Sequence, residues 1–372
     1  MPQLLNDAEM IERIFDHMDS RTTDTGDVVW REPTENYRSQ ARFEAELALL
    51  RRTPVPFCPS AALPENGSYV ARIAAGTPLV VVRDPEGVVR AFVNVCRHRG
   101  MQVAKGAGCA KGFVCPYHGW AYGLDGQLKH IPGKEGFPGV DPQTHGLREV
   151  SAAEKGGLVY VNQENPISAD ELADVPDLIA PDQALFDQAE FEDEANWKLI
   201  AESVMEGYHI KSLHRTTFYP YGLDNINVVE LFGNNARITF PFRRIESLRD
   251  VEPGERRIEG MVTYLYKLFP NAHIAVLSKH ASFVVLEPVS PSRTRYVVYS
   301  VMGKSNGSRE ISVEDARRDA EFVAKMGLEE DREATRAIQE GLASNANSHL
   351  TFGHFEKAIA HFHKNLAARI DS

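Results

Sequence analysis

The stretch "NVCRHRGMQVAKGAGCAKGFVCPYHGW" (residues 94–120) contains two short segments with the same layout. Each segment supplies one cysteine and one histidine, namely Cys96 with His98 and Cys115 with His118. Two thiolates and two imidazoles form a donor set that suits either a zinc ion or a [2Fe-2S] cluster. The repeated layout therefore predicts a metal site built from two loops.

The distribution of the donors between the loops favours the cluster. Zinc fingers usually pair two cysteines in one hairpin and two histidines in a helix, whereas each loop here holds one of each. A Rieske centre requires such loops, because two histidines replace two cysteines on one of its irons. Gly100 and Gly119 permit tight turns around the sulfides, and Trp120 is expected to supply an apolar cover. Structural zinc and four unrelated residues in a β-domain are the alternatives.

The two segments, "CRHRG" and "CPYHGW", closely resemble the cluster motif in the catalytic (alpha) subunit of the Rieske-type non-heme iron oxygenases. Respiratory Rieske proteins carry an additional cysteine in each loop, where this sequence has Met101 and Tyr117 nearby. The other cysteines, Cys58 and Cys109, have no obvious partner and are expected to be ordinary small residues. The resemblance implies a [2Fe-2S] cluster held by the four donors of the two loops.

Composition excludes several classes of protein. The 372 residues carry a net charge of −11, with 43% hydrophobic and 25% charged residues. A chain this long can bury the cores of two or more domains, so a metal site is expected to serve function rather than folding. The apolar runs are too short to cross a bilayer and the N-terminus lacks a secretory signal, so we expect a cytoplasmic protein without a membrane role. Without a Lys/Arg block, a nucleic-acid partner is not expected.

The spacing of apolar residues and the placement of turn residues along the sequence predict three parts. Residues 1–52 are predicted to be a helical segment that packs with the catalytic domain, from apolar spacings of three and four. Residues 53–165 alternate short apolar strands with turns such as Asn66-Gly67, which predicts an all-β Rieske domain. Residues 166–372 mix helices and strands, so the fold class is α+β. The resemblance implies a helix-grip (START-like) catalytic domain with an antiparallel sheet in this last part.

A second pair of histidines lies in "ANWKLIAESVMEGYHIKSLH", predicted as helix over about 196–214. A mononuclear Fe(II) that activates O₂ uses two histidines and one carboxylate on one face. His209 and His214 are five residues apart, which is about 140° around an ideal helix, so the helix must be distorted or end between them to reach one ion. Without the surrounding motif, two histidines five residues apart are more often a pair on the protein surface than metal ligands. The surrounding residues resemble the family's N-W-K…D/E-x-Y-H-x4-H signature, which implies that both histidines bind iron.

The third iron ligand is expected in "LEEDREATRAIQEGL", part of a predicted helix over about 312–343. The resemblance aligns Asp331 with the family's distal aspartate. Helical periodicity places Asp331 on a stripe and leaves Glu329 and Glu330 off it. The stripe comprises Leu328, Thr335, Ile338 and Leu342. The alternative is a solvated acidic start of a helix.

Glu206 lies three residues before His209, close enough on a helix to share its face. In the family an acidic residue here, often aspartate, connects an iron-binding histidine to a cluster histidine of the adjacent subunit. The resemblance thus implies that Glu206 connects His209 to His118 across a subunit boundary. Glutamate also occurs here in relatives that act on quaternary amines, while the role of Glu202, one turn earlier, stays open.

The resemblance implies a terminal oxygenase component with one [2Fe-2S] cluster and one mononuclear Fe(II) per subunit. An NAD(P)H-dependent reductase or a ferredoxin would supply electrons, O₂ and a small organic molecule would be the substrates, and head-to-tail association would form a homotrimer. Aromatic-ring hydroxylation is the first expectation, followed by N- or O-demethylation and quaternary-amine hydroxylation, with insertion of one or two oxygen atoms left open. Residues 218–222 and 264–271 are candidates for the pocket, with core packing as their alternative role. Two other functions are the alternatives to an oxygenase: an electron carrier with the cluster alone, and a zinc-stabilised binding module without iron.

Overall fold

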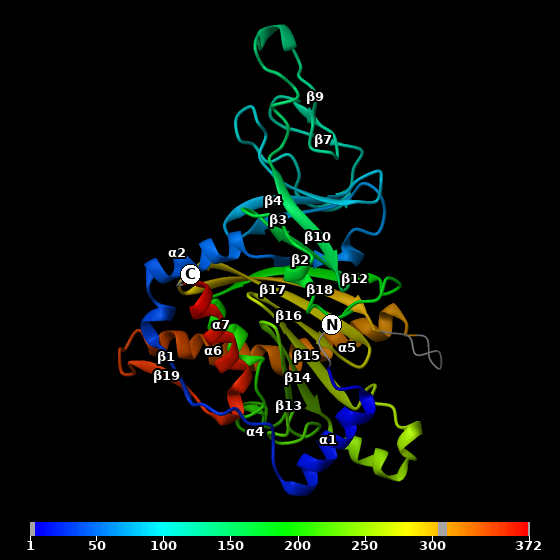
Figure 1. Cartoon of the computed structure of the whole chain (residues 1–372), viewed down its shortest axis with the longest axis vertical. Coiled ribbons are helices and arrows are strands. Elements are labelled where there is room, and N and C mark those ends of the chain that lie inside the picture. Colours follow the sequence, from blue (N-terminus) through cyan, green and yellow to red (C-terminus); the bar gives the residue numbers. More distant parts are fainter. Residues whose placement is uncertain (1–3, 304–310, 371–372) are drawn as a thin grey trace. The chain divides into compact units, whose positions relative to one another are not determined.

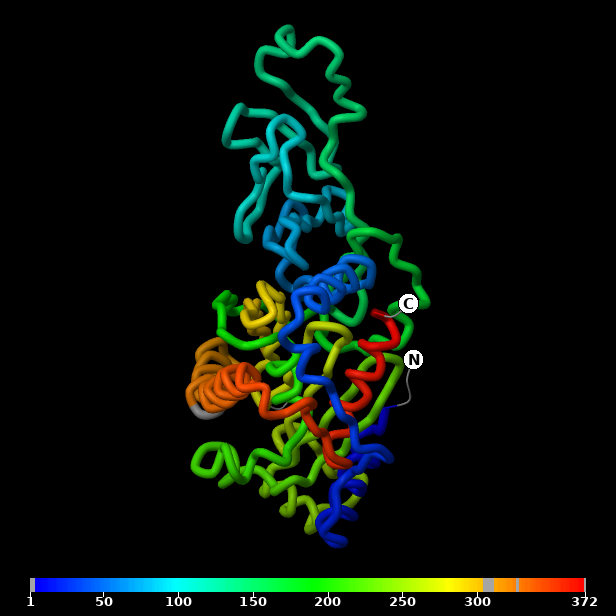
Figure 2. Tube along the Cα trace, turned by 90° about the vertical axis from the view of Figure 1, so that its left-hand side faces the viewer, coloured from blue at the N-terminus to red at the C-terminus, as the bar shows by residue number. Residues whose placement is uncertain are grey.

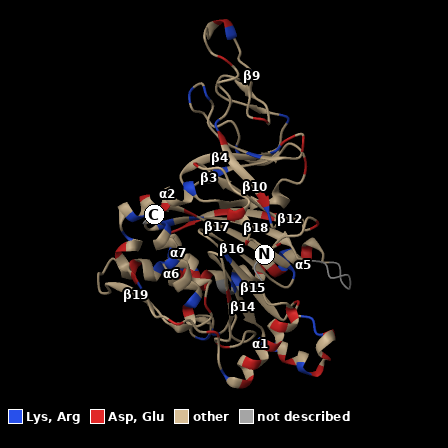
Figure 3. Ribbon diagram, viewed as in Figure 1, with Lys and Arg blue, Asp and Glu red and all other residues tan. Residues whose placement is uncertain are grey.

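The computed structural model describes residues 4–303 and 311–370, except for the side chains of residues 326–327. None of the helices in these ranges has the length and apolar composition that crossing a lipid bilayer requires. Acidic and basic residues are interspersed along the elements, as the colours of the ribbon in Figure 3 show. Some of them pair across neighbouring strands, as Arg295 does with Glu192 at 2.6 Å. The negative charge is therefore spread over many elements.

The chain divides into two compact units, and Figure 1 labels many of their elements. The smaller unit is Leu50–Asp182, and the larger unit combines Met1–Leu49 with Gln183–Ser372. Residues 166–182, expected at the start of the catalytic part, thus belong to the smaller unit. The limits of the functional domains given above stay a prediction.

The smaller unit is all β apart from the last turn of α2 (Gln40–Arg52) and short 3₁₀ turns. Its main sheet has seven antiparallel strands in the order β2-β11-β10-β5-β4-β3-β6, and a second sheet has three strands, β7-β8-β9. The strands are β2 (Val55–Pro59), β3 (Ser68–Ala74), β4 (Thr77–Arg83), β5 (Val89–Val93), β6 (Gly106–Cys109), β7 (Phe113–Val114), β8 (Ala121–Tyr122), β9 (Leu128–His130), β10 (Glu149–Lys155) and β11 (Leu158–Asn162). The 3₁₀ turns are η2 (Ser60–Ala62), η3 (Lys134–Gly136) and η4 (Asp170–Leu172). The predicted small all-β domain is confirmed.

The turn between β4 and β5 forms where the sequence predicts it. The buried carboxylate of Asp84 accepts hydrogen bonds from the backbone N–H groups of Glu86 and Val88, at 3.0 and 2.8 Å. The same carboxylate pairs with Arg90 at 2.7 Å. Gly87 has φ of +80°, a conformation that side chains with a Cβ rarely adopt. These contacts stabilise the hairpin, and β5 then leads into the first cysteine loop.

The larger unit contains a seven-stranded antiparallel sheet in the order β12-β18-β17-β16-β15-β14-β13. Its strands are β12 (Leu185–Asp193), β13 (Val228–Phe232), β14 (Asn235–Pro241), β15 (Val262–Leu268), β16 (Ala272–Val276), β17 (His280–Ser290) and β18 (Arg293–Met302). The helices of the chain are α1 (Asp7–Ser20), α2 (Gln40–Arg52), α3 (Trp197–Ser203), α4 (Ile210–Leu213), α5 (Val313–Val323), α6 (Glu329–Leu342) and α7 (Lys357–Ile370), with the π-helical segment η7 (Ala324–Leu328) between α5 and α6. The 3₁₀ helices here are η1 (Thr34–Tyr37), η5 (Arg243–Asp250), η6 (Pro253–Glu255) and η8 (His354–Glu356).

Helices α3 and α7 bury their apolar faces against this sheet. Trp197 and Ile200 of α3 share one core with Phe362 of α7, and the rings of Trp197 and Phe362 meet edge to face at 5.7 Å. Ile238 of β14 and Leu286 of β17 belong to the same core. Burial of such side chains is the main favourable term in folding. The predicted antiparallel sheet covered by helices is confirmed.

The N-terminal segment is only partly helical, in contrast to the prediction for residues 1–52. Helices α1 and α2 form where the apolar spacing predicts them, but an extended piece separates them. There β1 (Trp30–Pro33) pairs antiparallel with β19 (His349–Phe352), and the blue segment runs beside the red one in Figures 1 and 2. Local periodicity could not reveal this pairing, because the partner strand comes from the far end of the chain.

The helix predicted over 196–214 is interrupted. Helix α3 ends at Ser203, and the next helical turn, α4, covers only Ile210–Leu213. Between them Gly207 lies so close to the side chain of Asn227 that a Cβ at this position would collide with it. The interruption determines how the histidines on either side of α4 are presented.

Candidate metal centres

The first cysteine loop follows β5 and is closed by two backbone hydrogen bonds. The N–H of Cys96 donates to the carbonyl of Met101 at 2.8 Å, and the N–H of Gly100 donates to the carbonyl of Cys96 at 3.0 Å. Gly100 has φ of +80°. Such a turn needs glycine because the left-handed conformation is costly for residues with a Cβ.

The second cysteine loop joins β7 to β8 and repeats these contacts. The N–H of Cys115 donates to the carbonyl of Trp120 at 2.8 Å, and the N–H of Gly119 donates to the carbonyl of Cys115 at 2.9 Å. Gly119 has φ of +72°, close to its counterpart in the first loop. Two loops with the same internal hydrogen bonds can present their donors to one centre in equivalent ways.

The donor side chains of the two loops fit a cluster. Cys96 and Cys115 are only 2% and 3% exposed. His98 stacks on Trp120 with ring centroids 5.0 Å apart, and its ring lies 4.6 Å from that of the exposed His118. The Nδ1 atom of His98 is buried without a hydrogen-bond partner. A buried polar atom without a partner is costly, and a bound iron would satisfy it.

Tyr122 is a residue of this site that the sequence interpretation did not identify. Its hydroxyl accepts a hydrogen bond from the backbone N–H of Arg97 at 2.9 Å and lies 3.3 Å from Cys96 Sγ. The hydroxyl proton is thus free to point at the sulfur, and hydrogen bonds to cluster sulfurs influence reduction potential. The available signal was its position two residues after Trp120, because side chains two apart in extended chain point to the same side.

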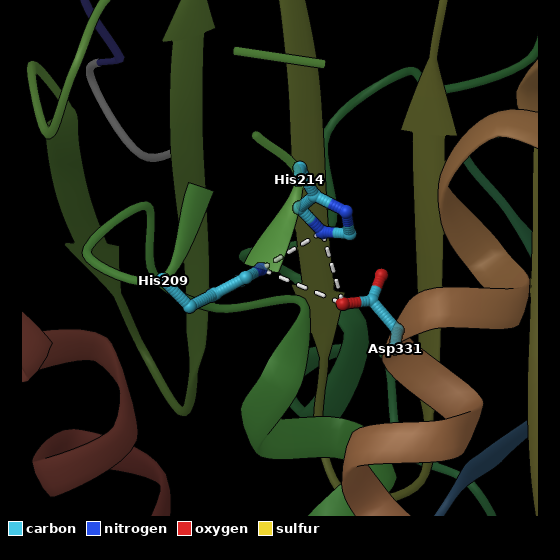
Figure 4. A group of neighbouring side chains, drawn as sticks. All are labelled: His209, His214 and Asp331. Carbon is cyan, nitrogen blue, oxygen red and sulfur yellow. Dashed lines mark hydrogen bonds and ion pairs between the residues drawn. The ribbon is translucent and has the colours of Figure 1, made fainter. Parts of the chain in front are cut away.

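Figure 4 shows the side chains of His209, His214 and Asp331 pointing toward one another. His214 Nε2 lies 3.2 Å from His209 Nε2 and 3.1 Å from Asp331 Oδ1. His209 Nε2 and Asp331 Oδ1 are 3.5 Å apart. Two imidazole nitrogens and one carboxylate oxygen thus form a small triangle, which is the donor set of mononuclear Fe(II) sites. These residues are called the triad below.

The two histidines flank a single helical turn. His209 is the N-cap of α4 and His214 is its C-cap, with the four residues of the helix between them. The expectation that a long helix could not present both rings to one ion is confirmed, because α3 has already ended. Asp331 comes from the first turn of α6, which follows the π-helical segment Ala324–Leu328. Such segments are frequent at functional sites.

The stripe argument for Asp331 was only partly right. Thr335 and Leu342 are buried as expected, at 2% and 6% exposure. Leu328 and Ile338, however, are 45% and 44% exposed, so they do not belong to a buried face. Helix α6 therefore buries a narrower strip than its apolar residues suggest.

A carboxylate contacts the outer nitrogen of each histidine. His209 Nδ1 donates to Glu206 Oε1, and the backbone N–H of His209 donates to Glu206 Oε2 at 3.1 Å. His214 Nδ1 donates to Glu330 Oε2 at 2.7 Å. Glu206 was expected beside His209, whereas Glu330 was placed off the stripe that contains Asp331. Its contact depends on where α6 lies, which helical periodicity does not specify.

The acidic surroundings favour positive charge at the triad. Burial opposes protonation of His209, but its hydrogen bonds to Asp331 and Glu206 outweigh burial and raise its pKa to about 10. Burial by itself would raise the pKa of Asp331. Hydrogen bonds from His209 and His214 outweigh burial, and the pKa of Asp331 is lowered. The site without metal therefore retains protons that a divalent cation would replace.

Glu202, whose role the sequence left open, is engaged elsewhere. Its Oε1 atom accepts hydrogen bonds from the hydroxyl of Tyr37 and from His363 Nε2, both at 2.8 Å. The ring of His363 also lies 3.4 Å from Glu32. All four side chains are buried. Glu202 thus connects α3 to the N-terminal segment and to α7.

Two family models match the chain. The model described as "Ring hydroxylating alpha subunit (catalytic domain)" matches residues 184–372, and the "Rieske [2Fe-2S] domain" model matches residues 53–143. Among solved structures, a quaternary ammonium Rieske monooxygenase, described in terms of carnitine oxidation and inter-subunit electron transfer, is similar with a TM-score of 0.78. The sequences are 22% identical, and the match covers 93% of this chain and 96% of that one. At this identity the likeness shows the fold.

Three relatives illustrate the range of similarity. The chain is 35% identical to the glycine betaine monooxygenase oxygenase subunit of Chromohalobacter salexigens, over 41% of this chain and 36% of that protein. It is 31% identical to the carnitine monooxygenase oxygenase subunit of Acinetobacter baumannii, over 50% and 53%. It is 25% identical to the anthranilate 1,2-dioxygenase large subunit of Burkholderia cepacia, over 86% and 85%. With both family models matched, the chain belongs to the ring-hydroxylating alpha subunits, the Rieske non-heme iron oxygenases that join a [2Fe-2S] domain to a mononuclear iron domain.

Proposed function

We propose that the chain is a terminal oxygenase component that uses O₂ and external electrons to hydroxylate a small organic molecule. The triangle of His209, His214 and Asp331, with sides of 3.1 to 3.5 Å, is the observation that carries this proposal. An iron held on one face by three protein ligands keeps other positions open, and when bound it supplies the capacity to activate O₂. An electron carrier would not need this second site.

The residues of the chain have distinct roles in this proposal. Cys96, His98, Cys115 and His118 would hold the [2Fe-2S] cluster. In the larger unit Glu206 accepts the Nδ1 proton of His209 and so directs Nε2 into the triad. The ring of Phe218 lies 5.0 Å from the ring of His214 and helps to shield it from water. The side chain of His214 is only 2% exposed.

The proposed partners are an NAD(P)H-dependent reductase or a ferredoxin as the electron source, and two further copies of the chain. Electron transfer between subunits is described for the similar quaternary ammonium monooxygenase. In a head-to-tail homotrimer, Glu206 would connect His209 to His118 of the partner subunit. The exposure of His118 supports this role, because a histidine that passes electrons outward must be reachable.

For the substrate we propose a quaternary ammonium compound. The glycine betaine and carnitine monooxygenases among the relatives support this class, as does glutamate at position 206, which we noted for relatives acting on quaternary amines. An aromatic acid is the second candidate, supported by the match to the anthranilate dioxygenase over 86% of the chain. This assignment replaces the first expectation of an aromatic ring.

Metal analysis tests the site assignment. Anaerobically purified protein is expected to hold about three irons and two sulfides per chain, two irons in the cluster and one at the triad. His209→Ala should remove one iron and leave the cluster absorption intact. Two irons in the unaltered protein would favour an electron carrier, and zinc without sulfide would favour a binding module.

Substrate consumption distinguishes the two substrate classes. With a reductase that reduces the cluster, O₂ uptake is expected to be coupled to product formation with glycine betaine, choline or carnitine. Anthranilate and benzoate serve as the matched aromatic set. Coupled turnover of the aromatic set alone would reverse the substrate assignment and leave the oxygenase assignment intact.

A further inference from the structure

His214 is held from its outer side by the carboxylate of Glu330. The distance from His214 Nδ1 to Glu330 Oε2 is 2.7 Å, and the His214 side chain is only 2% exposed. An ionised carboxylate only accepts hydrogen bonds, so this contact assigns the ring proton to Nδ1. Nε2 then faces Asp331 Oδ1, 3.1 Å away, where without metal it shares a proton with the carboxylate and where a metal ion would take that proton's place.

Glu330 is itself restrained by a second donor. The hydroxyl of Thr217 donates to the same Oε2 atom at 2.6 Å. Thr217 follows His214 in the turn after α4, whereas Glu330 lies in the first turn of α6 beside Asp331. One carboxylate therefore connects the segment that carries a histidine of the triad to the helix that carries its aspartate.

The arrangement has a parallel at the other histidine. Glu206 contacts Nδ1 of His209, and the backbone N–H of His209 donates to the same carboxylate at 3.1 Å. Each histidine of the triad thus has its own carboxylate at Nδ1, one from the same segment and one from a distant helix. The contact of Glu206 with His209 follows from a spacing of three residues. The contact of Glu330 with His214 forms only when the chain is folded.

We propose that Glu330 is a positioning residue of the iron site, an inference that rests on the proposed function. It holds His214 in the tautomer that presents Nε2, and it fixes the start of α6 so that Asp331 converges on the same point. Hydrogen-bond partners of metal-bound histidines typically contribute about 10–100-fold to metal affinity. A purely structural acid on a helix would leave that affinity unchanged.

The test measures Fe(II) affinity in anaerobic protein that retains its cluster but lacks iron at the triad. Glu330→Ala is expected to raise the Fe(II) dissociation constant by about 10–100-fold, measured by competition with a chelator. Glu330→Gln keeps an acceptor oxygen without the charge, so its loss should be smaller. The EPR signal of the nitric oxide complex should change its rhombicity in both variants, because the ligand field changes with the orientation of His214.

Glu329→Gln is the matched control. Glu329 is the neighbour of Glu330 on α6, its side chain is 63% exposed, and it pairs with Arg332 and Arg336 at the surface. Its removal should change neither the affinity nor the EPR signal. If Glu330→Ala fails to fold, judged by its circular dichroism and cluster absorption, the milder Glu330→Gln decides the question.

The outcomes separate this inference from the proposed function. If the unaltered protein binds about one Fe(II) that His209→Ala abolishes, the site assignment holds. Unchanged affinity and EPR signal in both Glu330 variants would then overturn the positioning role alone. If the unaltered protein binds no Fe(II) beyond its cluster, the proposed function itself is wrong.

Discussion

The two cysteine loops and the triad are built in different ways. Each loop is closed by its own backbone hydrogen bonds, and all its donors lie within residues 96–118. The triad joins a single helical turn to an aspartate that is 117 residues away from His214. The loop geometry thus depends on glycine conformation and short-range contacts, whereas the triad depends on how distant helices pack. Changes in the core of the larger unit should therefore affect the triad alone.

A buried ion pair illustrates this dependence. Lys198, in the helix that precedes the triad, pairs with Glu46 of α2 at 2.7 Å, and these side chains are 0% and 1% exposed. The indole N–H of Trp197 donates to the same carboxylate at 2.8 Å. Burial of charge is tolerated only with such partners. The N-terminal segment thus helps to fix α3, from which the chain continues to the histidines.

Exchanging one ligand at each site should produce the largest effects. Asp331→Ala is expected to lower substrate turnover by at least about 100-fold, more than the loss of an outer hydrogen-bond partner, and to leave the cluster's visible absorption unchanged. Cys115→Ser is expected to abolish that absorption while the triad still binds Fe(II). Iron analysis and absorption spectra check each variant. Loss of both centres from either substitution would contradict their independence.

Glu46→Ala should destabilise the larger unit by about 3–5 kcal/mol, because it leaves the buried charge of Lys198 unpaired. The free energy of unfolding can be measured with urea and tryptophan fluorescence. The control is Glu314→Ala, which removes an exposed pair with Arg318 at 3.1 Å and should cost about 0–0.5 kcal/mol. Equal losses in the two variants would argue against a special role of the buried pair.

Fe(II) affinity at the triad should rise with pH. The pKa of His209 is raised to about 10 by Asp331 and Glu206 against the effect of burial, so at neutral pH the metal-free site carries a proton there. The ion needs the unprotonated nitrogen, so binding displaces that proton, and affinity should rise at least about tenfold per pH unit below this pKa. Titrations between about pH 6.5 and 8 would measure the slope, and a flat profile would contradict protonation of His209.

The same protonation has a linked effect on the metal-free protein. Because the pKa of His209 in the folded chain is raised above its ordinary value, its interactions stabilise the metal-free fold fully below that ordinary value, about 6.5. This stabilisation should decline as the pH rises toward about 10. Bound metal removes the effect, so the difference between metal-free and metal-bound protein isolates it.

The smallest predicted effect distinguishes the two cysteine loops from each other. Alanine at Gly100 or Gly119 must adopt a left-handed conformation, which costs about 1–2 kcal/mol. At Gly119 the new Cβ would also lie 3.1 Å from Pro132 Cγ, whereas at Gly100 the nearest atom is 4.0 Å away. Gly119→Ala should therefore lower the midpoint of thermal cluster loss more than Gly100→Ala. The reverse order would show that the close approach to Pro132 does not decide the cost of the substitution.

Local patterns were sufficient for much of this molecule. The alternating strands and turn residues predicted the all-β unit, and the repeated Cys/His layout indicated the cluster loops. The five-residue spacing of His209 and His214 indicated that they can reach one ion only if the helix predicted over 196–214 is distorted or ends between them, and that helix is interrupted. Where the same reasoning was extended across longer stretches, it was wrong: residues 1–52 are not continuous helix, and Leu328 and Ile338 are exposed.

By itself the sequence determined which residues bear the chemistry and which short elements carry them, because turns, periodicity and ligand spacing act over a few residues. Only the tertiary structure decided how these elements meet: Glu330 beside His214, Tyr122 beside Cys96, and Tyr37 on Glu202. Each of these contacts joins segments that are far apart in the chain. Their geometry depends on the packing of whole elements, and no local pattern specifies that packing.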